Sequence, residues 1–352
     1  MIKLAVIFGG KSSEHTVSIV SGTSIISNLD KKKYQIYPIY IDKEGNYYEY
    51  TKDVDKIIPL KIEDKITELK EIKNINKYLE KIDVVFPVLH GKYGEDGTIQ
   101  GMLELLGKKY VGCKVLSSSL CMDKVYTKII LEKGNIPVAR SMYIQKQDDK
   151  YIYIDKTFDR MVLNKEQLQN KIEEYLNYPV FIKPSREGSS VGITKVKNKK
   201  DLIEGIDYAF NYDTKVLIEE TIIGREVECA VLGNNEVIAS FVGEIIPAEE
   251  YYSYNSKYKN KESKTIIPAD ISNNLMEAIR KLAIKAYQAC DCCGLARVDF
   301  FIEENTNRII LNEINTLPGF TEISMYPKLM KHLGLTYSEL LDKLIELAMT
   351  NQ

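Results

Sequence analysis

The sequence predicts an α/β protein built from two or three domains. The chain has 352 residues, and chains divide into domains of roughly 150 residues. Hydrophobic residues make up 44% and charged residues 28% of it, which is typical of a globular protein with a substantial core. Strand-like and helix-like patterns alternate in the first third, and this alternation indicates a parallel sheet.

Composition excludes several classes of function. The formal net charge of −2 gives no indication of a nucleic acid or an anionic membrane as partner. The longest apolar runs, such as 84–89 and 129–131, are far too short to span a membrane. A strand-like segment from Lys3 to Phe8 begins the chain, so we expect no signal peptide and a cytoplasmic location. The six cysteines lack the spacing of a zinc site, and reduced thiols are expected.

Strand and helix signals in the first third follow one another closely. The apolar run LAVIF predicts a first strand, and Ser12 or Ser13 is expected to cap a helix that ends at Asn28. Further strands are expected at 34–41 and, in a buried position, at 83–89. The elements expected later are a hairpin and surface helix within 44–81, a helix at 122–133, two surface elements within 147–177, strands at 179–183, 191–196, 215–220, 226–232 and 237–244, helices at 199–210, 273–290 and 337–349, and a hairpin at 295–315.

The segment LARVDFFIEENTNRIILNEIN carries the strongest signal for chemistry. Two strand-like runs flank a polar turn, and a hairpin centred on Thr306 places Asp299 opposite Glu313 and Arg297 opposite Asn315. Because side chains alternate between the two faces of a strand, these four residues share one face.

The apolar neighbours of these carboxylates favour a buried site over the alternative, surface charges on a hairpin. Two buried carboxylates side by side repel each other unless a cation neutralises them. Magnesium binds carboxylate and amide oxygens and leaves positions for phosphates, so the hairpin predicts a magnesium site.

The segment FIKPSREGSSVGITKV predicts a strand that ends at Lys183, then a flexible loop from Ser185 to Ser190, then another strand. Backbone amides and hydroxyls in such a loop suit phosphate oxygens. The loop is not a Walker A loop, because no Gly-Lys-Ser/Thr opens a following helix. Such loops are often only mobile turns, but Lys183 and the magnesium-type hairpin together favour a nucleotide site. A polar loop between Pro247 and Lys264 has the length of a functional lid.

These segments, in this order, resemble the D-alanine–D-alanine ligases of the ATP-grasp superfamily. The matching segments are FGGKSSEHTVS, HGKYGEDGTIQG, CMDK, FIKPSREGSSVGITKV, IEETIIGREVECAVLG, VGEIIP with YYSYNSKY, GLARVDFF and LNEINTLPGFT. The resemblance implies a three-domain ATP-grasp fold with an N-terminal Rossmann-like parallel-sheet domain. Its parts would be a substrate domain at 1–120, a central domain at 121–213, and a C-terminal domain at 214–352 with the metal and oxyanion site.

The resemblance also implies roles for single residues. Those expected to bind ATP are Lys124, Lys183, Glu219, Glu226 and Lys257, and those expected to hold two Mg²⁺ (or Mn²⁺) ions are Asp299, Glu313 and Asn315. Those expected at the reaction centre are Glu14 for the first substrate's ammonium group, Ser189 and Tyr258 in a hydrogen-bonded triad with it, and Arg297 and the Gly319 amide as an oxyanion hole. Those expected beside the substrates are His90, Ser324 and Met325.

The implied reaction joins two D-alanines through an acyl phosphate, at the expense of ATP, for peptidoglycan precursor synthesis. Homodimers are usual in the family. Relatives that use D-lactate tend to place a histidine where this chain has Tyr258, and those that favour D-serine an arginine where it has Met325, so D-alanine is expected as second substrate. Two alternatives are a D-alanine–D-serine ligase and a catalytically silent homologue, which would be expected to lack a metal ligand or a phosphate lysine.

Overall fold

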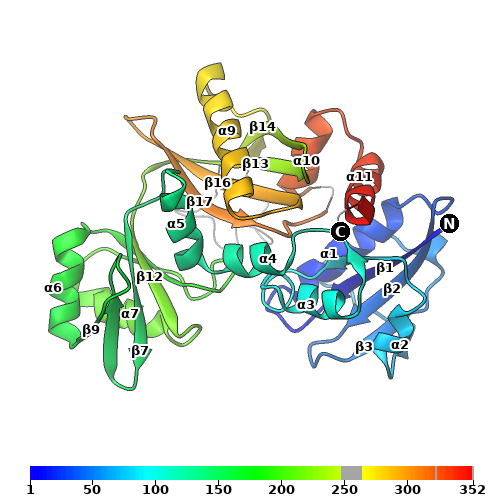
Figure 1. Ribbon diagram of the computed structural model, residues 1–352, viewed down its shortest axis with the longest axis horizontal. Helices are drawn as coiled ribbons and strands as arrows, with labels where there is room; N and C mark the ends of the chain where they lie inside the picture. The colour runs from blue at the N-terminus through cyan, green and yellow to red at the C-terminus, as the bar shows by residue number, and fades with distance from the viewer. Residues whose placement is uncertain (247–263, 322, 351–352) are drawn as a thin grey trace.

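The protein contains three β-sheets with helices packed on them, as seen in a computed structural model that describes residues 1–246, 264–321 and 323–350. Figure 1 shows the first and second sheets at opposite ends of the molecule, with the third above and between them. The α/β class predicted from the sequence is therefore confirmed. In the described part of the chain, no helix has the length and apolar character needed to cross a membrane.

The first sheet has the strand order β4-β3-β2-β1-β5-β6. Its strands are β1 (Ile2–Gly9), β2 (Tyr34–Ile41), β3 (Tyr47–Tyr50), β4 (Leu69–Glu71), β5 (Val84–Val88) and β6 (Lys109–Tyr110). β1 is parallel to β2 and β5, and β5 is parallel to β6, so the predicted parallel sheet is confirmed. β3 and β4 extend the sheet by antiparallel pairing within the segment where a hairpin was expected.

Helix α1 (His15–Asn28) packs directly on β1. Gly22 allows this close approach, because a Cβ atom there would lie 2.5 Å from the Cβ of Phe8. The predicted cap was wrong, since the residue before the helix is Glu14 and no side chain caps it. The Ser12 hydroxyl instead accepts a hydrogen bond from the Glu14 amide and donates one to the His90 carbonyl. The other helices of this region are η1 (Val54–Lys56), α2 (Ile75–Leu79) and α3 (Thr98–Leu105).

Two helices connect the first sheet to the second. α4 (Val115–Met122) was not predicted, whereas α5 (Lys124–Lys133) was expected with nearly these bounds. α5 begins after Asp123, whose carboxylate accepts hydrogen bonds from the amides of Val125 and Tyr126. It ends at Gly134.

The second sheet is antiparallel and has the order β11-β10-β12-β7-β8-β9. Its elements are β7 (Ser141–Gln147), β8 (Lys150–Ile154), β9 (Arg160–Leu163), α6 (Lys165–Tyr175), β10 (Val180–Pro184), β11 (Thr194–Val196), η2 (Lys199–Asp201), α7 (Leu202–Ala209) and β12 (Lys215–Glu220). Three elements, rather than two, occupy most of 147–177. Because β12 pairs within this sheet, the change of sheet follows Glu220, later than the predicted boundary at 213/214.

The third sheet has the order β15-β14-β13-β16-β17. Its strands are β13 (Gly224–Gly233), β14 (Val237–Ile246), β15 (Lys264–Ile266), β16 (Gly294–Glu303) and β17 (Ile309–Asn315). Its helices are α9 (Asn273–Ala289), the unpredicted α10 (Met325–His332) and α11 (Tyr337–Thr350). The predicted pairs are confirmed, since Asp299 lies opposite Glu313 and Arg297 opposite Asn315.

Alternation along β16 separates a core face from a cavity face. Ala296, Val298 and Phe300 belong to an apolar cluster with α9. Arg297 and Asp299 therefore point to the other face of the sheet, as the two-residue period of a strand requires. α11 returns to the first sheet and ties it to the third, in part through the Tyr34 hydroxyl, which donates to the Asp342 carboxylate at 2.8 Å.

Candidate active site

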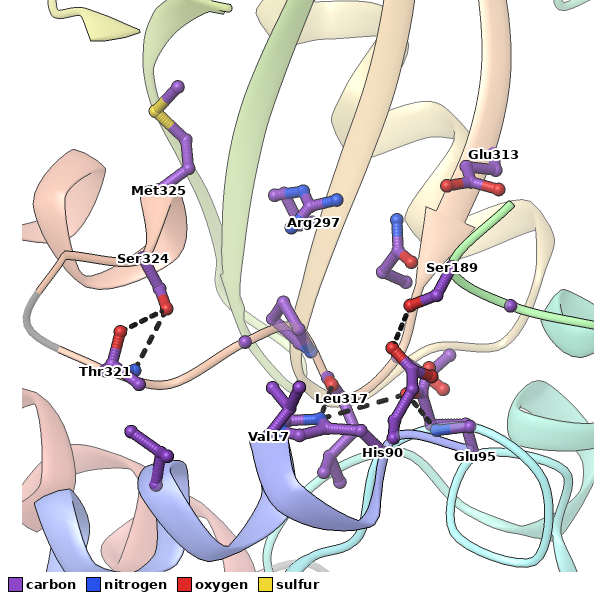
Figure 2. A pocket seen from close by; sticks show the side chains of 18 of the residues that line it. Val17, His90, Glu95, Ser189, Arg297, Glu313, Leu317, Thr321, Ser324 and Met325 are labelled. Carbon is purple, nitrogen blue, oxygen red and sulfur yellow. Dashed lines mark hydrogen bonds and ion pairs between the residues drawn. The ribbon is translucent and has the colours of Figure 1, made fainter. Parts of the chain in front are cut away.

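Two adjoining cavities lie where the three sheets meet. The first has a volume of about 580 Å³, and the second about 610 Å³. The two cavities have a common wall formed by Lys124, Glu187–Ser189, Ile245 and Glu313. Figure 2 shows part of the first cavity, with Arg297 and Glu313 on one side and His90 on the other.

The hairpin supplies a dense cluster of charge to the first cavity. The Arg297 guanidinium donates to both oxygens of Asp299, at 2.8 and 2.7 Å, and forms an ion pair with Glu228 at 2.9 Å. The Asn315 amide donates to Asp299 at 2.9 Å. Burial lowers the pKa of Arg297, but Asp299 and Glu228 outweigh this and raise it well above its usual value. Arg297 is therefore a permanent cation at the cavity wall.

Glu228 was not identified from the sequence, although a period-two pattern could have indicated it. It lies on β13 directly opposite Asp299 of β16, and its side chain is buried. The repulsion expected between Asp299 and Glu313 was an incomplete description, because Arg297 already neutralises Asp299 and the Lys124 ammonium lies 3.9 Å from Glu313.

The geometry of the predicted metal ligands fits a hard cation. Asp299 and Glu313 face each other across β16 and β17, and Asn315 contacts Asp299 on the same face. Carboxylate and amide oxygens are the ligands that Mg²⁺ and Mn²⁺ prefer. Within the described ranges, no group of three or more His, Cys, Asp or Glu residues is placed to hold a metal. The predicted set has two carboxylates and one amide, so phosphate oxygens or water would have to complete the coordination of an ion there.

A second charge cluster forms the wall of the second cavity. The buried Glu219 carboxylate on β12 contacts Lys128 of α5 at 2.9 Å and also forms an ion pair with Lys183 of β10. Burial raises the pKa of Glu219, but the two lysines outweigh this and hold it at about 2. Lys128 was missed from the sequence because a lysine within an amphipathic helix gives no local signal. Glu226 also lines this cavity, as expected from its predicted role in nucleotide binding.

The glycine-serine loop after β10 is tied to the start of α5. The Ser185 hydroxyl donates to Asp123 at 2.7 Å, and the buried Lys215 ammonium binds the same carboxylate at 2.6 Å. Ser189 and Ser190 adopt positive φ angles of 48° and 61° within this loop. Gly192 has a positive φ of 71°, which is incompatible with strand geometry, so the strand expected at 191–196 begins only at residue 194.

This loop also reaches the first sheet. The Ser189 hydroxyl donates a hydrogen bond to the Glu14 carboxylate, which lies just before α1. Lys124 at the start of α5 donates to the Glu187 carbonyl of the same loop at 2.7 Å. Ser189 and Glu14, two predicted site residues from distant segments, are thus hydrogen-bonded to each other. Tyr258 and Lys257, which were expected to complete this region, and most of the predicted lid at 247–264 lie outside the described residues.

His90 is buried and bonded through both ring nitrogens. Nδ1 lies 3.1 Å from the Leu317 carbonyl, and Nε2 lies 2.9 Å from the Ser21 hydroxyl. Burial lowers the pKa of His90. Glu95, within HGKYGEDG, accepts a hydrogen bond from the Gly91 amide, and burial together with the Glu14 charge raises the pKa of Glu95 to about 8.

The end of the first cavity near α10 carries the remaining predicted residues. Gly319 lines the cavity and is half-buried. The Ser324 hydroxyl accepts a hydrogen bond from the Thr321 amide at 3.0 Å. Met325 is buried and lies against Gly243, where a Cβ atom would be only 2.7 Å from the methionine sulfur. Met325 therefore both packs on β14 and lines the cavity.

None of the six cysteines, all of which lie in described segments, forms a disulfide. Five of them are buried, as expected for structural thiols.

Comparisons with known proteins identify the family of this chain. Residues 3–113 match the family model for the D-ala D-ala ligase N-terminus, and residues 142–346 match that for the D-ala D-ala ligase C-terminus. The chain belongs to the D-alanine–D-alanine ligase family. This confirms the resemblance drawn from the motifs and the ATP-grasp fold that it implied.

Individual ligases agree with this assignment over nearly their whole length. The D-alanine–D-alanine ligase of Clostridium acetobutylicum is 49% identical, with 98% of this chain and 97% of the relative covered. The crystal structure of the VanG D-Ala:D-Ser ligase of Enterococcus faecalis has a TM-score of 0.84 and 41% identity, covering 99% of each chain. The Bacillus anthracis D-alanine–D-alanine ligase complexed with ATP has a TM-score of 0.74 and 31% identity, covering 99% of this chain and 98% of that one.

Proposed function

We propose that this protein joins two molecules of D-alanine at the expense of ATP, for peptidoglycan precursor synthesis. The observation that carries the proposal is the common wall of the two cavities, where Lys124, Glu313 and the loop of Ser189 lie between a lysine-rich cavity and one lined by Arg297. This arrangement suits a nucleotide on one side and amino acids on the other. The names of the relatives support the same activity.

The lysines of the second cavity bind the triphosphate. Lys124 and Lys183 line this cavity, and their ammonium groups compensate the charge of the transferring phosphoryl group. We propose that Lys257 joins them and that Glu226 binds the nucleoside. Glu219 orients Lys183 through their ion pair and so acts beside the nucleotide.

Two Mg²⁺ or Mn²⁺ ions would be held by Asp299, Glu313 and Asn315, where they would draw charge from the β- and γ-phosphates. Arg297 contributes to this site by fixing the orientation of Asp299 through two parallel hydrogen bonds.

The first D-alanine binds with its ammonium group at Glu14, and its carboxylate attacks the γ-phosphorus. The bond between this phosphorus and the ADP oxygen breaks, which gives an acyl phosphate and ADP. The amine of the second D-alanine then attacks the acyl carbon, and phosphate leaves as the peptide bond forms and the amine loses a proton. Arg297 and the Gly319 amide stabilise the tetrahedral oxyanion.

The second substrate is D-alanine rather than D-serine or D-lactate. Met325 presents an apolar wall and no donor for a serine hydroxyl. Tyr258 would place no positive charge near an incoming ammonium group, whereas a histidine could repel it. We also propose that the protein is cytoplasmic and that it forms a homodimer. Light scattering of the purified protein would test the dimer.

ADP release tests the proposal directly. The purified protein with ATP and magnesium should release ADP only when D-alanine is added, with one D-alanyl-D-alanine formed for each ADP. ATP binding without D-alanine-dependent turnover would instead identify a catalytically silent homologue.

A further inference from the structure

The segment that carries Gly319 has no regular secondary structure of its own. It follows β17 and runs from Thr316 to Phe320. Leu317 and Phe320, which lie on either side of Gly319, are buried, and Gly319 is half-buried in the cavity wall. An irregular backbone depends on contacts from elsewhere for a fixed orientation. The contacts made by Leu317 and Phe320 therefore determine where the amide between them points.

Two of these contacts converge on one pair of side chains. The Leu317 carbonyl lies 3.1 Å from Nδ1 of His90, which Figure 2 shows directed at that segment. The Phe320 amide donates to the hydroxyl of Ser21 at 3.4 Å, and this hydroxyl lies 2.9 Å from Nε2 of His90. Ser21 and His90 thus hold the segment on both sides of Gly319.

The chemistry of these groups fixes the direction of each hydrogen bond. A carbonyl oxygen can only accept, so Nδ1 of His90 carries the proton. Nε2 of a neutral imidazole is then an acceptor, and the Ser21 hydroxyl donates to it. The hydroxyl oxygen still accepts from the Phe320 amide, so every group in this chain of three bonds has a partner of the correct type.

The surroundings agree with a neutral imidazole. Burial lowers the pKa of His90 and, together with the Arg297 charge, outweighs the Glu14 charge and the hydrogen bond to the Leu317 carbonyl, both of which raise it. Glu95 is the other carboxylate nearby, but its oxygen lies 3.9 Å from Nδ1, beyond hydrogen-bonding distance. His90 therefore acts through its hydrogen bonds.

We propose that Ser21, acting with neutral His90, is a positioning residue that holds the Leu317–Phe320 segment so that the Gly319 amide points to the reacting carbonyl. This inference rests on the proposed function and adds a residue to it. Because the oxyanion forms only after the substrates have bound, a misplaced amide should lower kcat and leave the KM values unchanged.

Replacement of Ser21 by alanine tests this role. We expect kcat for dipeptide formation to fall at least about tenfold, with the KM values for ATP and D-alanine within about twofold of wild type. Ser118→Ala is the matched control, because Ser118 is equally buried and its hydroxyl bonds to the Cys113 carbonyl rather than to the segment. The control should keep wild-type kcat. An equal loss of kcat in both variants, or a full kcat in Ser21→Ala, would overturn the proposal.

Nitrogen-15 spectra of histidine-labelled protein test the arrangement without any turnover. The chain has only three histidines, so the His90 signals can be assigned by their loss in His90→Gln. At neutral pH the wild type should show a protonated Nδ1 and an unprotonated, hydrogen-bonded Nε2, and Ser21→Ala should shift the Nε2 signal alone. A protonated Nε2 in the wild type would overturn the proposal. If the wild type forms no dipeptide, the proposed function fails, and the spectra still decide whether Ser21 orders His90.

Discussion

Replacing Glu219 by glutamine would test the buried charge cluster of the second cavity. The difference between the usual pKa of 4.5 and the value of about 2 for Glu219 corresponds to a net stabilisation of about 3 kcal/mol, in which Lys128 and Lys183 more than offset the cost of burial. Breaking a buried ion pair by removing one partner costs a similar amount, about 3–5 kcal/mol. We therefore expect Glu219→Gln to lower the free energy of unfolding by about 3 kcal/mol at pH 7 in the absence of ATP.

The pH dependence of this loss has a definite sign. The pKa of Glu219 is lower in the folded protein than in the unfolded chain, so its contribution is present above pH 4.5 and is lost as the pH falls from 4.5 towards 2. The difference in stability between wild type and Glu219→Gln should therefore shrink over that range.

Glu220→Gln provides a matched control on the same strand. Glu220 pairs with Arg140 at 2.8 Å, but the guanidinium is 51% exposed, so this variant should lose no more than about 1 kcal/mol. Urea unfolding followed by circular dichroism at pH 7, pH 4 and pH 3 measures all three proteins. The reasoning fails if Glu219→Gln loses no more than the control at pH 7, or if its deficit stays constant down to pH 3.

Asp299→Asn should abolish turnover and cost about 3 kcal/mol of stability because Arg297 loses its paired acceptor, whereas Glu313→Gln should abolish turnover with little loss of stability. ADP release and urea unfolding distinguish the two, and near-normal turnover of both at low magnesium would contradict the metal assignment. Glu95→Gln should stabilise the ATP-free protein by several kcal/mol at pH 8 but not at pH 4. The reason is that the pKa of Glu95 is raised to about 8 in the folded protein, so its carboxyl destabilises the fold as the pH rises from 4.5 to 8. A pH-independent effect in thermal unfolding would refute this. With equimolar D-alanine and D-serine, we expect D-alanyl-D-alanine to be the main product because Met325 offers no donor to the serine hydroxyl, and the ratio of the two dipeptides should be on the order of a hundred at most. A majority of D-alanyl-D-serine by mass spectrometry would show the opposite specificity.

The sequence predicted the register of the β16–β17 hairpin correctly only at the polar pairs formed by Arg297 and Asp299. The pairs of Arg297 and Asp299 are correct, but beyond Asp299 the register shifts, so that Phe300 lies opposite Leu311 and Asn312 is the extra residue. A β-bulge leaves the apolar character of both strands unchanged, so hydrophobic periodicity could not reveal it.

Tertiary contacts account for most of what the sequence did not predict. The hydrogen bond between Ser189 and Glu14, 175 positions apart, was predicted from the family resemblance and is confirmed, but no local sequence pattern indicated it. Lys128 and Ser21 lie on helices whose local pattern is that of any amphipathic or buried helix, and their contacts are with distant residues, Glu219 on β12 and His90 in the loop after β5. Motifs therefore predicted the residues expected to contact substrates, whereas the residues that hold these in place required the structure.

The common wall of the cavities indicates where phosphoryl transfer would occur. Lys124 contacts the Glu187 carbonyl on one side and approaches Glu313 on the other, so a single ammonium group faces both cavities. A phosphoryl group passing from nucleotide to amino acid would stay beside this charge throughout the transfer, and it would not have to leave one set of cations before it reached another. Since the glycine-serine loop belongs to the second sheet and β17 to the third, this wall exists only when these two sheets are packed together.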